Sequence, residues 1–120
     1  MRAEDGDDAL ETLFLPFIDG PLAWPASGEA PFTALFLRAR DGWPLHQRGW
    51  PGLHCEQSFR PAADALERSG LPLVDEDDDT RVPLVLVLPP RQRDEARALF
   101  ARAVARCAPG GRVVACLPNN

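Results

Sequence analysis

A short stretch of the chain combines arginines with tryptophans, two residue types that contact single-stranded nucleic acid. Aromatic rings stack on bases, and arginines contact the phosphates. The residues with this chemistry are Arg38, Arg40, Trp43, Arg48 and Trp50. The sequence therefore predicts a candidate RNA-contact patch here. The alternative, which we favour for the tryptophans, is that their rings pack in the core or at an interface.

An acidic run, Asp75–Asp79, offers carboxylates to a hard cation. A calcium loop needs alternating ligands, a central glycine and a distal glutamate, and this run lacks that pattern. A solvated acidic loop is the favoured interpretation. The alternative is that Asp75 or Glu76 follows the second strand of a nucleotide-binding fold, where an acidic side chain holds a ribose.

Two histidines and a cysteine, His46, His54 and Cys55, lie within ten residues of one another. No second Cys/His pair completes a zinc set, and no third group is identified that would orient a Cys–His nucleophile. Surface or packing roles are therefore favoured, and we predict no metal site. With Cys107 and Cys116 the chain has three cysteines and no CxxC pair, which indicates buried, reduced thiols.

Three arginines, Arg91, Arg93 and Arg97, follow a double proline at the expected carboxyl edge of a sheet. Ligands of parallel sheets bind at that edge, so an anion contact is one interpretation. The favoured alternative is a solvated helix face on which Arg93 and Arg97 pair with Asp94.

The overall composition restricts the setting in which these residues act. The net charge is −5, whereas domains that bind nucleic acid usually present a basic face. If the chain belongs to an RNA-modifying enzyme, we expect another part of that enzyme to hold the RNA. No apolar stretch reaches the roughly 18 residues of a membrane span, and Met1–Glu11 contains no signal-peptide core. With reduced thiols, these features predict a cytoplasmic protein without a membrane partner.

The last third of the chain predicts a strand, a helix and a second strand. The apolar run Val82–Leu88 indicates a strand covered on both faces. Arg91–Cys107 carries an apolar face at helical spacing, formed by Ala96, Leu99, Phe100, Ala103, Val104 and Cys107. Pro109–Gly111 ends the helix, and Val113–Leu117 is predicted to be a further buried strand. A right-handed connection makes the two strands parallel.

A similar unit is predicted earlier in the chain. Its parts are a buried strand Thr33–Leu37, a helix Pro61–Ser69 and a short strand Leu71–Val74. We predict an irregular segment at 43–54, a helix end or strand at 10–18, and a short hairpin strand at 22–24. Residues 1–8 are predicted to be a flexible acidic terminus. The class is α/β, with a mostly parallel sheet flanked by helices over residues 9–120, incomplete at the carboxyl end.

Several segments of this sequence resemble a known enzyme family. VLVLPP (Val85–Pro90), APGG (Ala108–Gly111) and RVVACLPNN (Arg112–Asn120) are similar to the second half of a class I S-adenosylmethionine-dependent methyltransferase. Glu11–Phe17, Leu22–Pro25 and Ala34–Gly42 resemble the N-terminal domain of the bacterial 16S ribosomal RNA guanine-N2 methyltransferase family. In that family a degenerate N-terminal copy supports folding and RNA recognition, and a C-terminal copy binds the methyl donor.

The sequence departs from the family at both functional loops. A donor site needs closely spaced glycines after the first strand, and Gly42, Gly49 and Gly52 are too far apart. The catalytic NPPF-type loop would need an Asn or Asp before the double proline, where this chain has Leu88. The resemblance therefore implies no catalytic and no cofactor-binding residue here.

The resemblance implies a non-catalytic domain with S-adenosylmethionine only in the parent enzyme. Its partners would be a C-terminal catalytic domain and, through the parent, ribosomal RNA. One alternative is a stand-alone interaction module that forms a homodimer through exposed sheet surface. A second is a small active methyltransferase with an atypical donor loop.

Overall fold

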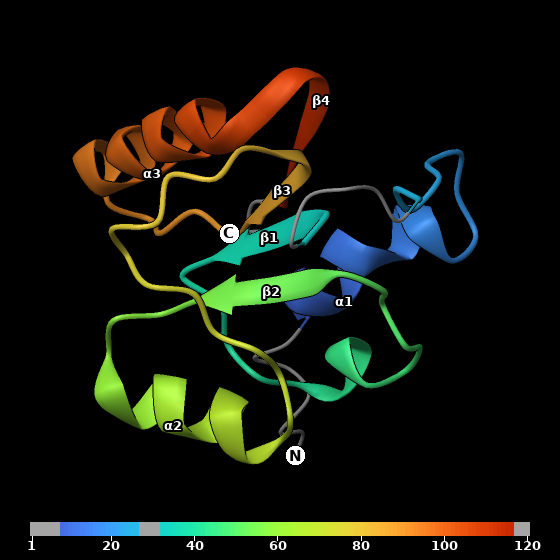
Figure 1. The fold of residues 1–120 in the computed structure, drawn as a ribbon, viewed down its shortest axis with the longest axis horizontal. Helices are drawn as coiled ribbons and strands as arrows, with labels where there is room; N and C mark the ends of the chain where they lie inside the picture. The colour runs from blue at the N-terminus through green and yellow to red at the C-terminus, as the bar shows by residue number, and fades with distance from the viewer. Residues whose placement is uncertain (1–7, 27–31, 117–120) are drawn as a thin grey trace.

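The computed structural model describes residues 8–26 and 32–116, and their core is a four-stranded parallel sheet. The strands are β1 (Ala34–Leu37), β2 (Leu53–Glu56), β3 (Val82–Val87) and β4 (Cys107–Ala115). Their order across the sheet is β2-β1-β3-β4, and every pair is parallel (Figure 1). The predicted α/β class is confirmed.

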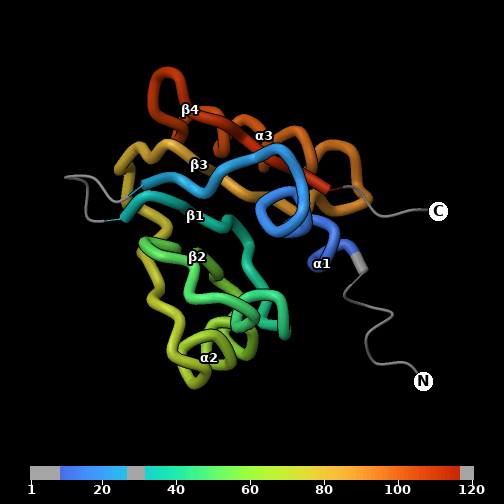
Figure 2. Tube along the Cα trace, turned by 90° about the vertical axis from the view of Figure 1, so that its right-hand side faces the viewer, coloured from blue at the N-terminus to red at the C-terminus, as the bar shows by residue number. Residues whose placement is uncertain are grey.

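Helical elements cover both faces of the sheet. They are α1 (Asp8–Phe14), α2 (Arg60–Arg68), α3 (Arg93–Arg106) and the 3-10 turns η2 (Leu15–Phe17) and η3 (Trp43–Leu45). Figures 1 and 2 show α3 on one side of the sheet and α2 and α1 on the other. We call these the α3 face and the aromatic face. The two long helices predicted from the sequence are confirmed, with ends shifted by one or two residues.

The register of β1 and β3 explains their uninterrupted apolar sequences. Leu35 and Leu37 lie beside Val85 and Val87 and pack against Leu99 and Ala103 on the α3 face. The alternate residues face the other way, into a cluster that includes Ala34, Phe36, Leu84, Leu86, Phe14 and Leu66. Because successive side chains of a strand point to opposite faces, both faces must be apolar here. The prediction that Val82–Leu88 is covered on both sides is thus confirmed.

Five aromatic rings give the aromatic face its name: Phe14, Phe17, Trp24, Phe36 and Trp50. The ring centroids of Trp24 and Trp50 are 4.7 Å apart, and those of Phe14 and Trp50 are 5.0 Å apart. The Trp50 indole N–H donates to the Pro44 carbonyl at 2.8 Å, so the buried polar atom has a partner. This arrangement places large rings in contact and satisfies the indole nitrogen.

The second strand of the sheet begins inside the segment 43–54, which the sequence predicted to be irregular. β2 begins at Leu53 and pairs in parallel with β1. The predicted strand Leu71–Val74 is reduced to a single parallel bridge between Cys55 and Leu73. The first βαβ unit therefore runs from β2 through α2 to this bridge. Counting the bridge, the order across the sheet is Leu73-β2-β1-β3-β4.

The amino-terminal expectations are corrected in part. Residues 10–18 are helical, in α1 and η2, so the helix alternative holds. Residues 22–24 form no strand, and the Trp24 ring packs into the aromatic cluster. Of the predicted flexible terminus 1–8, residues 1–7 lie outside the described residues, and Asp8 begins α1. Within the described ranges, no helix is both long and apolar enough to span a bilayer.

The predicted Pro-Gly-Gly turn is part of β4. The strand starts directly after α3, at Cys107, and its pairing with β3 is irregular between Val82 and Leu84. A Cβ on Gly111 would lie 2.7 Å from the Pro83 carbonyl oxygen, so only glycine fits this close approach. β4 pairs with β3 alone in the described part of the chain, and it is half exposed rather than buried.

One predicted core residue of α3 faces solvent. Val104 is 64% exposed, whereas Leu99 and Ala103 are buried. The apolar face of the helix is therefore narrower than its sequence suggests.

Candidate functional site at the carboxyl edge of the sheet

The sheet has a topological switch point between β1 and β3. From β1 the chain continues outward to β2, and from β3 it continues in the opposite direction to β4. Open parallel sheets bind ligands outside the carboxyl ends of the strands at such a point. Leu37 and Val87, which are paired across the sheet, mark the two strand ends. The residues that follow them form the candidate site.

Arg38 follows β1 and has a backbone conformation that is unusual for a residue other than glycine. Its φ is 52°, in the left-handed region. The chain then turns through Ala39, whose N–H donates to the Glu56 carbonyl at 2.9 Å, and enters the single 3-10 turn η3. A donor-binding fold has a glycine loop and a full helix at this place. Here neither is present between β1 and β2.

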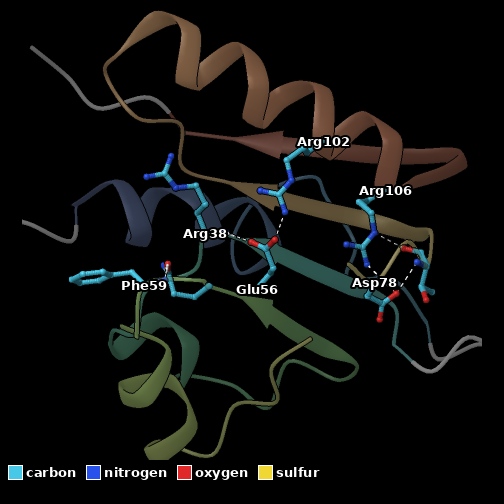
Figure 3. Close-up of polar contacts among 8 residues, drawn as sticks. Arg38, Glu56, Phe59, Asp78, Arg102 and Arg106 are labelled. Carbon is cyan, nitrogen blue, oxygen red and sulfur yellow. Dashed lines mark hydrogen bonds and ion pairs between the residues drawn. The ribbon is translucent and has the colours of Figure 1, made fainter. Parts of the chain in front are cut away.

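Glu56 is the last residue of β2 and has a buried carboxylate, with only 3% of the residue exposed. The carboxylate accepts from the Arg102 guanidinium of α3 and, at 3.4 Å, from the Arg38 backbone N–H (Figure 3). A buried carboxylate is stabilised when paired and hydrogen-bonded in this way. Glu56 is thus the acidic side chain at the end of the second strand, and the guanidinium of Arg102 on α3 balances its charge.

The expectation that Asp75 or Glu76 follows the second strand is wrong. Both residues follow the bridge at Leu73, which lies beyond β2 at the outer edge of the sheet. Glu56 holds the position after β1 at which nucleotide-binding folds place their acid, close to the ~20 residues expected. Sequence reasoning missed it because β2 itself was not recognised.

The connection from Leu73 to β3 crosses the α3 side without a helix. We call residues 75–81 the strap. Arg106 of α3 donates from Nε to the Thr80 carbonyl at 2.8 Å, and its guanidinium lies 3.5 Å from an Asp78 carboxylate oxygen (Figure 3). The Thr80 N–H donates to Asp78 Oδ1 at 2.8 Å. Hydrogen bonding by the Thr80 side chain, and secondly this backbone bond, lowers the pKa of the Asp78 carboxyl. The acidic run is therefore an exposed connection that is fixed to α3 at one point.

The histidines and Cys55 do not form a common site. His46 Nε2 lies 2.8 Å from Asp41 Oδ1 at the surface, whereas the His54 ring stacks on Phe32 on the α3 face. Cys55 is next to His54 on β2, so its side chain points to the opposite face. Burial, with a smaller effect of the Asp41 charge, raises the pKa of the Cys55 thiol to about 12. Cys55 is therefore an inert core thiol.

The predicted RNA-contact residues are divided between two edges of the sheet. Arg38 and Arg40 are exposed at the carboxyl edge, and Trp43 is 46% exposed on η3. Trp50 is buried in the aromatic cluster, which agrees with the core-packing alternative. Arg48 lies at the opposite edge, near the start of β2. The RNA-contact prediction itself is untested by these positions.

Arg48 helps to line a shallow hollow of about 420 Å³ at the amino edge of the sheet. The hollow is formed by the segment 45–50, Leu53 and the end of α2 with the residues after it, 69–72. Trp50, Leu53 and Leu71 contribute its apolar lining. Its size is in the range of small-ligand pockets. It contains no buried charged side chain that would orient a ligand.

The arginines after β3 are exposed, as expected. Arg91, Arg93 and Arg97 make no ion pair with any described residue, so the predicted pairing with Asp94 is absent. Gln92 caps α3 by accepting from the Glu95 N–H at 2.7 Å. The carboxyl edge therefore combines a buried acid that is already paired, Glu56, with exposed arginines that have no ion-pair partner among the described residues. Among the described residues, no group of three metal-ligating side chains is present. No family model, curated protein or solved structure matches the chain.

Proposed function

We propose that this chain is a non-catalytic, methyltransferase-like domain of a ribosomal RNA guanine-N2 methyltransferase. In this role it supports the folding and the substrate recognition of a C-terminal catalytic domain, which binds S-adenosylmethionine and transfers the methyl group. The strand order, with the Leu73 bridge outermost, agrees with a Rossmann-like sheet. The resemblance of the first and last thirds of the sequence supplies the family.

The observation that carries the proposal is the altered end of β1. Arg38 and η3 occupy the place of the glycine loop and helix that would hold a methyl donor. Glu56, at the position of a ribose-binding acid, is already paired with Arg102. A donor molecule would have to break this ion pair and would find no helix N-terminus beside it. The same edge is thus compatible with a domain that has lost donor binding.

Calorimetric titration of this chain with S-adenosylmethionine tests the proposal. We expect no stoichiometric complex with micromolar affinity. The variant Arg102→Ala, which frees the Glu56 carboxylate, is expected to behave in the same way, because the glycine loop is still missing. A one-to-one complex with the wild-type chain would contradict the proposal. Transfer of a labelled methyl group to ribosomal RNA by this chain alone would revive the alternative of a small active enzyme.

A second candidate function is a homodimerisation module, and the edge strand β4 favours it. β4 has nine residues and a free edge within the described structure, and Val104 on the adjoining α3 is 64% exposed. Exposed strand edges are templates for pairing with another chain. Light scattering at increasing concentration tests this candidate. A strict monomer would count against it.

A further inference from the structure

Four exposed arginines meet at the carboxyl edge of the sheet without partners. They are Arg38, Arg91, Arg93 and Arg97, and none makes a side-chain ion pair with the described residues. By contrast, Arg60, Arg102 and Arg106 are each paired with a carboxylate. Unpaired guanidinium groups that remain in solvent are available to an anionic partner.

The sheet topology brings these arginines together. Arg38 follows β1, and Arg91 and Arg93 follow β3, which is the direct neighbour of β1. Arg97 lies one turn into α3, which begins at the same edge. Asp94 and Glu95 are the acids of this helix turn, so four arginines less two acids leave a local excess of two positive charges. This charge contrasts with the net charge of −5 of the whole chain.

An exposed aromatic ring lies beside this charge. Phe59 precedes α2 and is 66% exposed. Figure 3 shows Phe59 and Arg38 projecting from the same edge of the sheet, each with its terminal group away from the core. The acidic strap, residues 75–81, begins after the Leu73 bridge, on the side of β2 that faces away from β1 and β3. The edge thus presents a flat ring next to a short row of cations.

We propose that Arg38, Phe59, Arg91, Arg93 and Arg97 form a contact surface for single-stranded RNA. The guanidinium groups bind successive phosphates, and the Phe59 ring stacks on a base. A ring with two-thirds of its surface in water distinguishes this surface from one that binds only acidic protein segments. The inference deepens the recognition role proposed above and rests on it for its biological meaning. It shares Arg38 with the patch predicted from the sequence and does not include Arg40, Trp43, Arg48 or Trp50.

Fluorescence anisotropy with a labelled twelve-nucleotide polyuridine tests the surface on the full chain. At about 50 mM salt we expect a dissociation constant on the order of 10⁻⁵ to 10⁻⁴ M, as for sequence-independent binding. The variant Arg91→Glu/Arg93→Glu is expected to bind at least tenfold more weakly. Its salt dependence should be shallower by about 1.4 in the log–log slope, since two phosphate contacts are lost. Phe59→Ala should lose roughly fivefold or more.

A matched control removes the same charge elsewhere. Arg68→Glu/Arg81→Glu changes two exposed arginines, one at the end of α2 and one before β3, at the amino edge of the sheet. We expect this control to weaken binding less than threefold. An equal loss in the control would overturn the proposal, because it would show a dependence on net charge alone. Absence of saturable binding up to roughly 1 mM wild-type protein would overturn it as well.

Two further measurements separate the remaining outcomes. If polyglutamate displaces the RNA as well as unlabelled polyuridine does at equal charge, the surface serves an acidic protein partner and the RNA proposal fails. Circular dichroism of each variant establishes that it is folded. Failure of RNA binding leaves the methyl-donor titration unchanged. The loss of this inference is therefore distinguishable from the loss of the proposed function.

Discussion

The two faces of the sheet are stabilised by different interactions. On the aromatic face, α1, η3 and α2 enclose a continuous apolar cluster with five large rings. On the α3 face, one helix covers β1 and β3, and the surface over β2 is closed by polar contacts of Arg102 and Arg106. A parallel sheet normally has helices on both faces. Here arginines replace a missing helix.

This difference between the two faces predicts where the fold tolerates substitutions. Apolar packing is strong but requires matched shapes, so the aromatic face is sensitive to any loss of volume. The polar closure of the α3 face depends on a few ion pairs, one of which joins the buried Glu56 carboxylate to the partly exposed Arg102 guanidinium. Forming such a pair adds little net stability, whereas removing one partner is costly because the other charge is left buried. We therefore expect the aromatic face to supply most of the stability of the fold, whereas the polar contacts on the α3 face fix the position of the strap, residues 75–81.

The largest expected effect comes from truncating the aromatic cluster. Phe14 is fully buried and contacts the rings of Trp24, Phe36 and Trp50. Phe14→Ala should lower the free energy of unfolding by about 3–5 kcal/mol. Urea denaturation followed by tryptophan fluorescence measures this loss. Leu15→Ala, at a neighbouring residue that is 45% exposed, is the control and should cost less than about 1 kcal/mol. If Phe14→Ala and Leu15→Ala lowered the free energy of unfolding equally, the aromatic face would not be the main source of stability.

A smaller effect is expected from the ion pair on the α3 face. Arg102→Ala leaves the Glu56 carboxylate buried without its cation, which should cost about 1–3 kcal/mol. The figure is below that of a fully buried pair, because the Arg102 side chain is 42% exposed and is screened by water. Adding Glu56→Gln should recover part of the loss, since the uncompensated charge is removed. Arg60→Ala, which breaks an exposed pair with Asp64, is the control, and its expected cost is under ~0.5 kcal/mol.

A double variant no more stable than Arg102→Ala alone would show that the charge of Glu56 is not the cause. The α3 face would then be stabilised by the aliphatic part of Arg102, and the contrast between the faces would narrow.

The smallest expected effect is a pH dependence of the strap. Hydrogen bonds from the Thr80 side chain and, secondly, from its backbone N–H lower the pKa of Asp78 in the folded chain. Its contribution to stability is thus complete above the unfolded pKa of about 4 and is lost as the pH falls through the folded value. Asp78→Asn should be less stable than the wild type at pH 6, and the difference should close toward pH 2. Asp79→Asn is the control. A difference that is constant from pH 2 to pH 6 would contradict this assignment.

The sequence was sufficient where a local pattern determines the structure. β1 and β3 are uninterrupted apolar runs, and α3 has helical periodicity with an acidic first turn. β2 was missed because its sequence, Leu53–Glu56, has only two apolar side chains and alternates with His54 and Glu56. An alternating strand of four residues among glycines and prolines is a weak pattern. The distance of Glu56 from β1 was the signal that could have revealed it.

The candidate site was less predictable than the fold. The pair of Glu56 and Arg102 joins residues 46 positions apart, so it arises only when α3 packs on the sheet. The exposure of Phe59 was not predictable either. This residue is apolar, yet its ring is exposed at the start of α2. Arg38 and Arg91 were each noted separately in the sequence. Only the adjacency of β1 and β3 places them at one edge.

The strap has a consequence for how the protein opens. A connection without a helix has few backbone hydrogen bonds of its own, and Arg106 holds it mainly at Thr80. Amide protons between 75 and 81 should exchange with solvent before those of β1 and β3, and a protease should nick the chain there first. Such an early opening would expose His54 and Glu56 to solvent while the aromatic cluster stays buried. Local unfolding would therefore begin on the α3 face alone.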